Sequence, residues 1–71
     1  MREVGIRTEP VELYKILKFE GLANSGGQAK AMIADGLVAV NGEIEKRKRR
    51  KIVSGDTISF DDEELVVKLE T

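Results

Sequence analysis

The sequence predicts a single α+β domain over residues 1–71, in which a corner of two short helices packs on a small, mainly antiparallel sheet of about four to five short strands. Three observations predict this fold. The chain is 71 residues long, which suits one domain with a small core. Apolar side chains recur at helical spacing between residues 13 and 33, and they alternate with polar side chains from residue 38 onward.

The first part of the chain predicts an edge strand and a helix. Val4 and Ile6 alternate with polar residues, which is typical of a short strand over residues 2–7. Thr8-Glu9-Pro10 is typical of a helix start, so we expect helix one over Val11–Glu20, with Gly21 as its stop. Its core face consists of Leu13, Ile16 and Leu17. Only three residues then lead to the second helix, which predicts a tight corner.

The stretch from Ser25 to Gly42 predicts a helix, its stop and a hairpin. Ser25 and Gln28 fit a capping box, and Ala29, Met32 and Ile33 form an apolar face. Gly36 is placed for a left-handed helix end, after which Leu37 would contact Met32. Val38 and Val40 alternate as in a half-buried strand, and Asn41-Gly42 predicts a two-residue hairpin turn. This turn would place Ala39 opposite Ile44 and leave a bulge or a very short second strand.

The remaining sequence predicts short strands around a basic run. Ile44 and Ile52 are an even number of positions apart, so one continuous strand would place both on the same face, together with Lys46, Lys48 and Arg50. A small core cannot bury these three cations. The run therefore leaves the sheet, and Ile52-Val53 returns to the core. We expect turns at residues 54–56 and 61–64, and strands around Ile58 and from Leu65 to Leu69. The expected order is strand, helix, helix and four strands, with Tyr14, Phe19 and Phe60 in the core.

Charge is segregated along the chain. Half of the 12 cations lie in one uninterrupted run, Lys46, Arg47, Lys48, Arg49, Arg50 and Lys51, although the formal net charge is −1. The run suits a nucleic-acid backbone, with arginine forks and lysine point charges on phosphates. A solvated, disordered loop that aids solubility is the alternative. The acidic run at residues 61–64 is interpreted as a solvated turn.

Gly26 and Gly27 fall in the first turn of helix two, where N–H groups have no intrahelical partner. A turn without side chains leaves these groups open to a phosphate, and Lys30 follows one turn later. The alternative is that the two glycines only shape a tight entry loop. Together with the basic run, they favour an anionic partner. The scarcity of aromatic residues argues against a platform of stacked bases and favours recognition of folded RNA by shape.

Several function classes are disfavoured. Histidine and cysteine are absent, so we expect no metal site, no cofactor and no acid–base pair, and hence no enzyme. No segment has the roughly 20 apolar residues of a membrane helix, and the first residues lack the apolar core of a signal peptide. We therefore expect a cytoplasmic, monomeric protein without membrane contact.

Several motifs in this order resemble one family. The runs DGLVAVNG (residues 35–42) and GDTI (55–58), placed after two helices, resemble the RNA-binding domain of small-subunit ribosomal protein S-four, also called the alpha-L motif. SGGQAK (25–30) and RKR (47–49) are most similar to its small stand-alone YbcJ-like group. The resemblance covers Val11 to Val67.

The resemblance implies a fold with a two-helix alpha-L corner and a stand-alone RNA-binding module for structured, ribosomal RNA. Its RNA contacts would come from the start of helix two and the hairpin beside it. Carried over, they are Ser25, Gln28, Lys30, Asn41 and the basic residues after the turn. The wider family has a basic residue after the serine, where this chain has Gly26, so the glycine backbone or the basic run would substitute. The alternative function is a protein-interaction adaptor that uses the basic run on an acidic partner.

Overall fold

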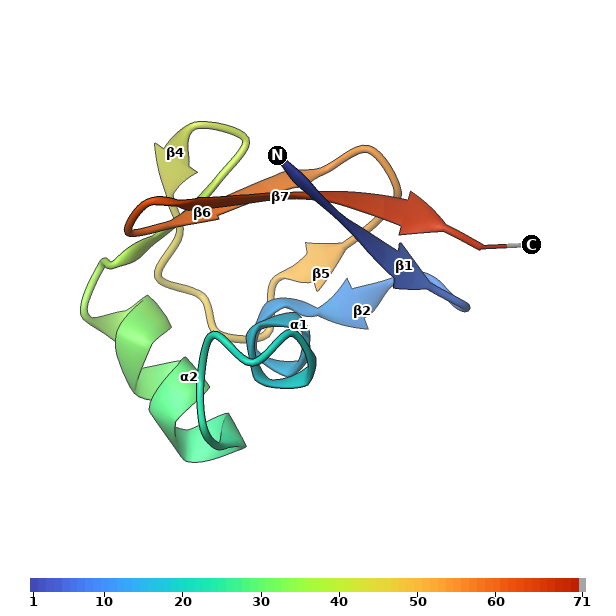
Figure 1. Ribbon diagram of the computed structural model, residues 1–71. Coiled ribbons are helices and arrows are strands. Elements are labelled where there is room, and N and C mark those ends of the chain that lie inside the picture. Colours follow the sequence, from blue (N-terminus) through green and yellow to red (C-terminus); the bar gives the residue numbers. More distant parts are fainter. Residues whose placement is uncertain (71) are drawn as a thin grey trace.

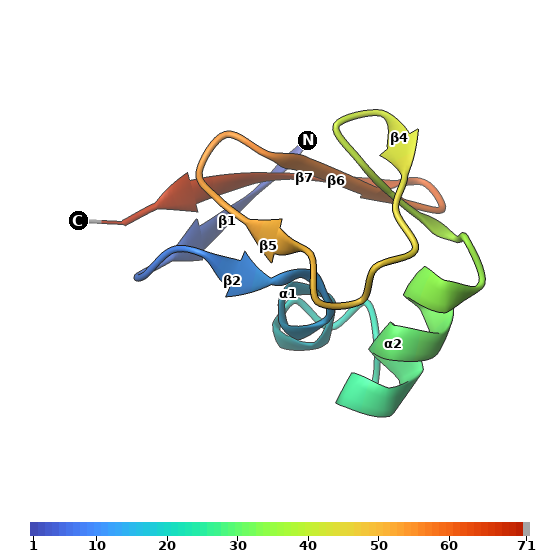
Figure 2. The ribbon, with the colours of Figure 1, turned by 180° about the vertical axis from the view of Figure 1, so that it is seen from behind.

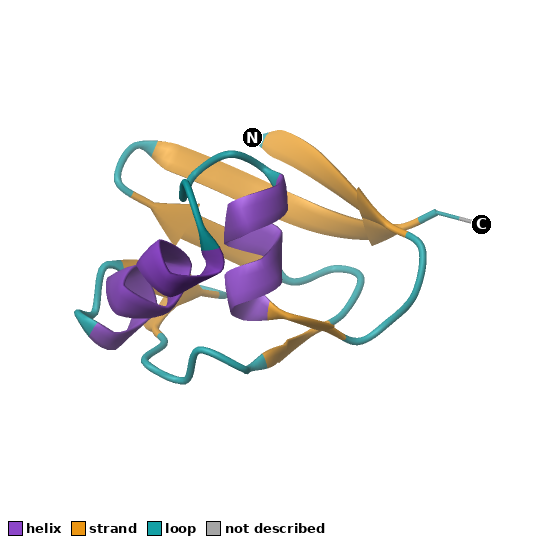
Figure 3. Ribbon diagram, turned by 90° about the horizontal axis from the view of Figure 1, so that it is seen from below, coloured by secondary structure: helices purple, strands orange, loops and turns teal. Residues whose placement is uncertain are grey.

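Two helices cover one face of a five-stranded sheet (Figure 1, Figure 3). The computed structural model describes residues 1–70. In chain order the elements are β1 (Arg2–Ile6), β2 (Val11–Glu12), α1 (Leu13–Phe19), α2 (Gly26–Ala34), β3 (Val38–Val40), β4 (Glu43–Ile44), β5 (Lys51–Ile52), β6 (Thr57–Phe60) and β7 (Glu63–Leu69). The predicted α+β class and the two-helix corner are confirmed.

The main sheet has the strand order β1-β7-β6-β3-β4. Only β1 and β7 pair in parallel within residues 1–70, so the sheet is mainly antiparallel, as predicted. β1 is an edge strand, which confirms the interpretation of the N-terminal segment. At the other edge Ala39 lies opposite Ile44, and β4 has two residues, so the predicted hairpin register and short second strand are both confirmed.

Both helices bury the faces that their apolar spacing predicts. These are Leu13, Ile16 and Leu17 in α1, and Ala29, Met32 and Ile33 in α2. They pack against Val38, Val40, Ile58, Leu65 and Val67 of the sheet. Burial of this apolar surface is the main stabilising contribution to a fold of this size.

Each helix ends at a glycine in the left-handed region, as predicted. Gly21 has φ +78° and Gly36 has φ +77°. The N–H of Leu22 donates to the Leu17 carbonyl at 3.0 Å, and the N–H of Leu37 donates to the Met32 carbonyl at 3.1 Å. These bonds satisfy carbonyls that the helix end leaves open. The side chain of Leu37 nevertheless stays 53% exposed, so the expected apolar contact at this helix end adds little to the core.

The predicted start of helix one is wrong. Val11 and Glu12 form β2, which pairs antiparallel with β5 in a separate two-stranded sheet, and α1 begins at Leu13. The signal at Pro10 concerns local conformation only. Pairing with a strand about 40 residues further along the chain, with Val11 opposite Ile52, overrides the local helix propensity of these residues.

Four smaller expectations also need correction. Five strands follow the helices rather than four, because β5 is a strand of the second sheet. Val53 is 42% exposed and Phe19 is 69% exposed, so neither lies in the core. The acidic turn contains only Asp61-Asp62, and Glu63 and Glu64 begin β7. Hairpin pairing of β6 with β7 extends to Phe60 opposite Glu63, which draws both glutamates into the strand.

The prediction that the basic run leaves the sheet is confirmed. Residues 45–50 form no strand, and the chain returns to extended pairing only at Lys51. Within residues 1–70, neither helix has the length and apolar composition needed to cross a membrane.

Candidate nucleic-acid interface

The start of α2 is capped by its own side chains. Ser25 has the extended conformation of an N-cap, and its Oγ accepts the Gln28 N–H at 3.1 Å. The Gln28 side chain also turns back, but its Oε1 accepts the N–H of Asn24 rather than that of Ser25. The predicted capping pair is therefore present, with the return bond one residue earlier than in a standard capping box.

Gly26 and Gly27 leave the first turn of α2 open. Their N–H groups are the first-turn donors that find no partner within residues 1–70, because the Gln28 and Ala29 N–H groups already bond Ser25. The first turn carries no acidic side chain. A Cβ built on Gly27 would come no nearer to another residue than 3.9 Å, at Ser25 Oγ. An anion can therefore approach this backbone without a steric or charge obstacle.

Tyr14 connects this turn with the basic run. The Lys30 ammonium lies 4.6 Å from the centre of the Tyr14 ring, and a Cβ on Gly26 would lie 3.8 Å from the same ring. The backbone N–H of Tyr14 donates to the Lys48 carbonyl at 3.2 Å. The sequence predicted Tyr14 in the core, and it is partly buried and packs against the core cluster, but this connecting role was not predicted. Its position next to Leu13, off the apolar helix face, is the signal that could have found it.

The basic loop, defined as residues 46–51, is held against the start of α1 (Figure 2). The side chain of the N-cap residue Glu12 makes no capping bond. Loop carbonyls take its place, because Arg50 accepts the Leu13 N–H at 2.9 Å and Lys48 accepts the Tyr14 N–H. A buried helix start needs such acceptors. The basic run is therefore anchored by backbone bonds, which argues against the interpretation as a disordered tail-like loop.

The charges of the basic loop divide into two groups. Arg47 and Arg50 form ion pairs with Glu45, and Arg49 Nε lies 3.8 Å from a Glu12 carboxylate oxygen. No ion pair involves the loop's three lysines within residues 1–70: Lys46, Lys48 and Lys51. A shallow hollow of about 500 Å³ is lined by Arg47, Arg49, Arg50 and Lys51. The loop thus combines cations free of acidic partners with a cationic hollow.

The Glu45 carboxylate is the charge that orders this loop. Hydrogen bonds from the guanidinium groups of Arg47 and Arg50 lower the pKa of Glu45 from 4.5 to about 2, although burial acts in the opposite direction. The same carboxylate raises the pKa of Arg47. Glu45 and Arg47 are therefore both charged at neutral pH.

Asn41 lies apart from these groups. The hairpin turn that contains it is on the far side of the sheet from the start of α2 (Figure 1). Its Oδ1 accepts the Thr57 N–H at 2.9 Å, and its Nδ2 donates to Asp56 Oδ1 at 3.0 Å. Of the predicted residues at the start of α2, the structure places Gly26 and Lys30 beside the Tyr14 ring, while the Tyr14 backbone bonds the basic loop. Ser25, Gly27 and Gln28 belong to the same helix start, whereas the Asn41 side chain joins two turns.

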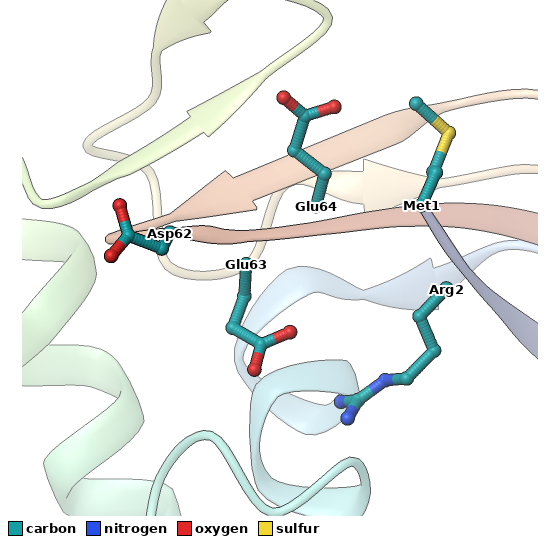
Figure 4. A pocket seen from close by; sticks show the side chains of 5 residues that line it. All are labelled: Met1, Arg2, Asp62, Glu63 and Glu64. Carbon is teal, nitrogen blue, oxygen red and sulfur yellow. The ribbon is translucent and has the colours of Figure 1, made fainter.

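A second hollow of opposite character adjoins the acidic run. It measures about 590 Å³ and is lined by Met1, Arg2, Asp62, Glu63 and Glu64 (Figure 4). Glu63 and Glu64 point to opposite sides of β7, as successive strand residues do. A polyanion would be repelled from this hollow and attracted to the cationic one.

Comparison with known proteins finds a matching family model and similar sequences. Residues 4–68 match the family model of the S4 domain. YbcJ of Escherichia coli (strain K12) is 58% identical over 50 residues, which cover 70% of this chain and 71% of YbcJ. RlbA of Bacillus subtilis (strain 168), named a probable ribosome maturation protein, is 34% identical over 58 residues, or 82% of each chain.

A solved structure is also similar. The solution structure of Escherichia coli YbcJ, described as having an alpha-L motif involved in RNA-binding, superposes with a TM-score of 0.73 and 46% identity. The similarity covers 96% of this chain and 87% of that one. It therefore includes both the two-helix corner and the basic loop.

Proposed function

Because the chain belongs to the S4 domain family, we propose that it binds RNA, with the basic loop and the start of α2 on the phosphate backbone. The observation that carries this proposal is the junction at Tyr14. This residue contacts Lys30 through its ring and Lys48 through its backbone, so two separate cationic segments adjoin one residue. The description of the similar YbcJ structure as an RNA-binding motif supports the assignment of the ligand.

We propose that phosphates supply most of the binding energy. Lys48 and Arg49 form the exposed turn of the basic loop, and the open N–H groups of Gly26 and Gly27 can donate to a further phosphate oxygen. Such contacts carry no base information. They suit recognition of the shape of a folded RNA, since of the three aromatic residues only Phe19 is mostly exposed.

The proposed RNA is structured and ribosomal. The name of RlbA, which refers to ribosome maturation, supports a ribosomal partner for this chain as well. In this proposal the protein acts as a cytoplasmic monomer that binds without a cofactor and performs no catalysis. The alternative adaptor function has no observation of its own in the structure.

A salt titration of RNA affinity tests the proposal. If about four loop cations and Lys30 contact phosphates, log K falls with log salt at a slope of roughly −3.5 to −4.5. The double variant Lys48→Ala/Arg49→Ala should flatten this slope by roughly 1.4–1.8, because two counterion-releasing contacts are lost. Neither side chain bonds Glu45, so the loop keeps its internal ion pairs.

The matched control is Arg7→Ala/Lys68→Ala, which removes the same charge at the residue after β1 and within β7. We expect its slope to equal that of the native protein. If both double variants change the slope equally, the charge acts non-locally and the loop is not the contact. If the native protein fails to bind a structured hairpin RNA at low salt, RNA binding itself is wrong and an acidic protein partner becomes the function to test.

A further inference from the structure

Glu45 is the one buried charged residue among residues 1–70, with 7% of its surface exposed. The hairpin geometry explains this position. Val40 lies opposite Glu43 and Ala39 opposite Ile44, and the Glu45 N–H donates to the Val38 carbonyl at 2.9 Å. Opposed residues of an antiparallel pair share a face, so the side chain of Glu45 lies on the same buried face of the sheet as that of Val38. A carboxylate in such a place is costly unless it is fully paired.

The carboxylate of Glu45 is fully paired by the basic loop. Oε2 accepts the backbone N–H and the Nε–H of Arg47, both at 3.0 Å. Oε1 accepts from Arg47 Nη2 at 3.0 Å and from Arg50 Nη1 at 2.8 Å. The Arg47 fork is therefore bidentate, which is the geometry that fixes a guanidinium most firmly. Two of the loop's three arginines are held by one buried group.

These bonds close the loop from one side while α1 holds it from the other. The Arg50 N–H donates to the Arg47 carbonyl at 3.2 Å, which closes a turn around Lys48 and Arg49. The carbonyls of Lys48 and Arg50 accept from α1. Six consecutive cations repel one another, and Glu45 offsets that repulsion within the folded turn. The side chain of Arg47 remains 75% exposed, so a guanidinium fixed by Glu45 still has a surface for a ligand.

We propose that Glu45 is a positioning residue for RNA binding: an acidic side chain strengthens the binding of a polyanion, because it holds Arg47 and Arg50 in the form of the basic loop that contacts phosphates. The inference rests on the proposed RNA-binding function and deepens it. Its physical basis is preorganisation, since a loop that is already folded loses less conformational entropy on binding.

The direction in which RNA affinity changes when Glu45 is neutralised tests the inference. Glu45→Gln removes a negative charge beside the basic loop, so simple electrostatics predicts tighter RNA binding. Positioning predicts the opposite, because the amide offers one oxygen in place of two and its NH₂ group cannot accept from Arg50 or Arg47. We expect Glu45→Gln to weaken binding of a structured hairpin RNA by on the order of tenfold, with a flatter salt slope, despite the added positive charge.

The matched control is Glu43→Gln, two residues earlier in the same hairpin. Glu43 is exposed and makes no ion pair within residues 1–70, so the same charge change should leave RNA affinity unchanged or slightly higher. Binding by Glu45→Gln as tight as that by Glu43→Gln would overturn the inference while the proposed function stands. Absence of RNA binding by the native protein would overturn both.

A second pair of variants keeps the test decisive if Glu45→Gln does not fold. Arg47→Lys and Arg49→Lys make the same charge-conserving exchange inside the basic loop, and only Arg47 makes a bidentate bond to Glu45. A lysine cannot reproduce the planar fork. We expect Arg47→Lys to lose several-fold more RNA affinity than Arg49→Lys. Equal losses would mean that each arginine acts only through its own phosphate contact, and the positioning role would be wrong.

Discussion

The backbone N–H of Tyr14 donates to the carbonyl of Lys48 at 3.2 Å, so the second residue of α1 holds the tip of the basic loop. The ring of the same tyrosine lies under the Lys30 ammonium and beside Gly26. One residue thereby contacts both segments from which we propose RNA contacts, the basic loop and the start of α2. Variants that change the free energy of unfolding can therefore be distinguished from variants that change RNA affinity.

Met32 tests the packing of the two helices. It is 8% exposed on the core face of α2, and truncation of such a side chain costs about 2–5 kcal/mol of unfolding free energy. Since a domain of this size has a net stability on the order of 3–5 kcal/mol, Met32→Ala should be largely unfolded in moderate urea. Leu37→Ala, at a side chain that is 53% exposed, is the control and should change stability little. Equal urea midpoints for the two variants would contradict the packing.

Gly27 tests the open helix start. Gly27→Glu places a carboxylate where we propose a phosphate, in space that a Cβ can occupy. An acid in the first turn and the replacement of a helical glycine both favour the helix, so this variant should be at least as stable as the native protein. Its RNA affinity should fall through repulsion, whereas the neutral Gly27→Gln should bind nearly as the native protein does. Fluorescence anisotropy with a labelled hairpin RNA measures both, and indistinguishable affinities for Glu and Gln would rule out an anion at this turn.

Asn41 tests the hairpin turn. It adopts φ +53° and its amide oxygen accepts the Thr57 N–H, so Asn41→Gly keeps the backbone conformation and removes the side-chain bonds. We expect the free energy of unfolding to fall by about 1–2 kcal/mol, with no change in the salt slope because no charge is removed. Asn24→Gly is the control, at an exposed asparagine whose side chain makes no bond within residues 1–70. An unfolding curve that Asn41→Gly leaves unmoved would contradict this structural role.

The Glu45 cluster predicts an acid-sensitive part of the stability. The folded-state pKa of Glu45 is about 2, below its ordinary 4.5, so the stabilisation is fully present above pH 4.5 and is lost as the pH falls toward 2. Urea midpoints of the native protein and of Glu45→Gln, measured from pH 6 to pH 2, should therefore converge at the acidic end. All other residues are the same in both proteins, so their contributions cancel in the comparison. A constant gap across this range would show that the ion pairs do not stabilise the fold.

The local features of this protein could be predicted from its sequence. Helical spacing identified the buried faces of α1 and α2, and Gly21, Gly36 and Asn41-Gly42 marked the stops and the hairpin turn. The alternation of side chains along a strand also indicated that the basic run has to leave the sheet. These features depend on residues a few positions apart, whose preferred conformations are much the same before and after folding.

The start of α1 and the conformation of the basic loop depend on tertiary contacts that no local pattern predicts. Val11 pairs with Ile52, and Leu13 is capped by Arg50, so both outcomes depend on residues about 40 positions away. Nothing in the sequence distinguishes Glu45 from the other acidic residues. Its role depends on the hairpin, which turns its side chain inward beside two arginines. Such hydrogen bonds and ion pairs carry no periodic signal, even where the partners are only two and five residues apart, as with Glu45, Arg47 and Arg50. The energy of each pair depends on a geometry that the whole fold creates.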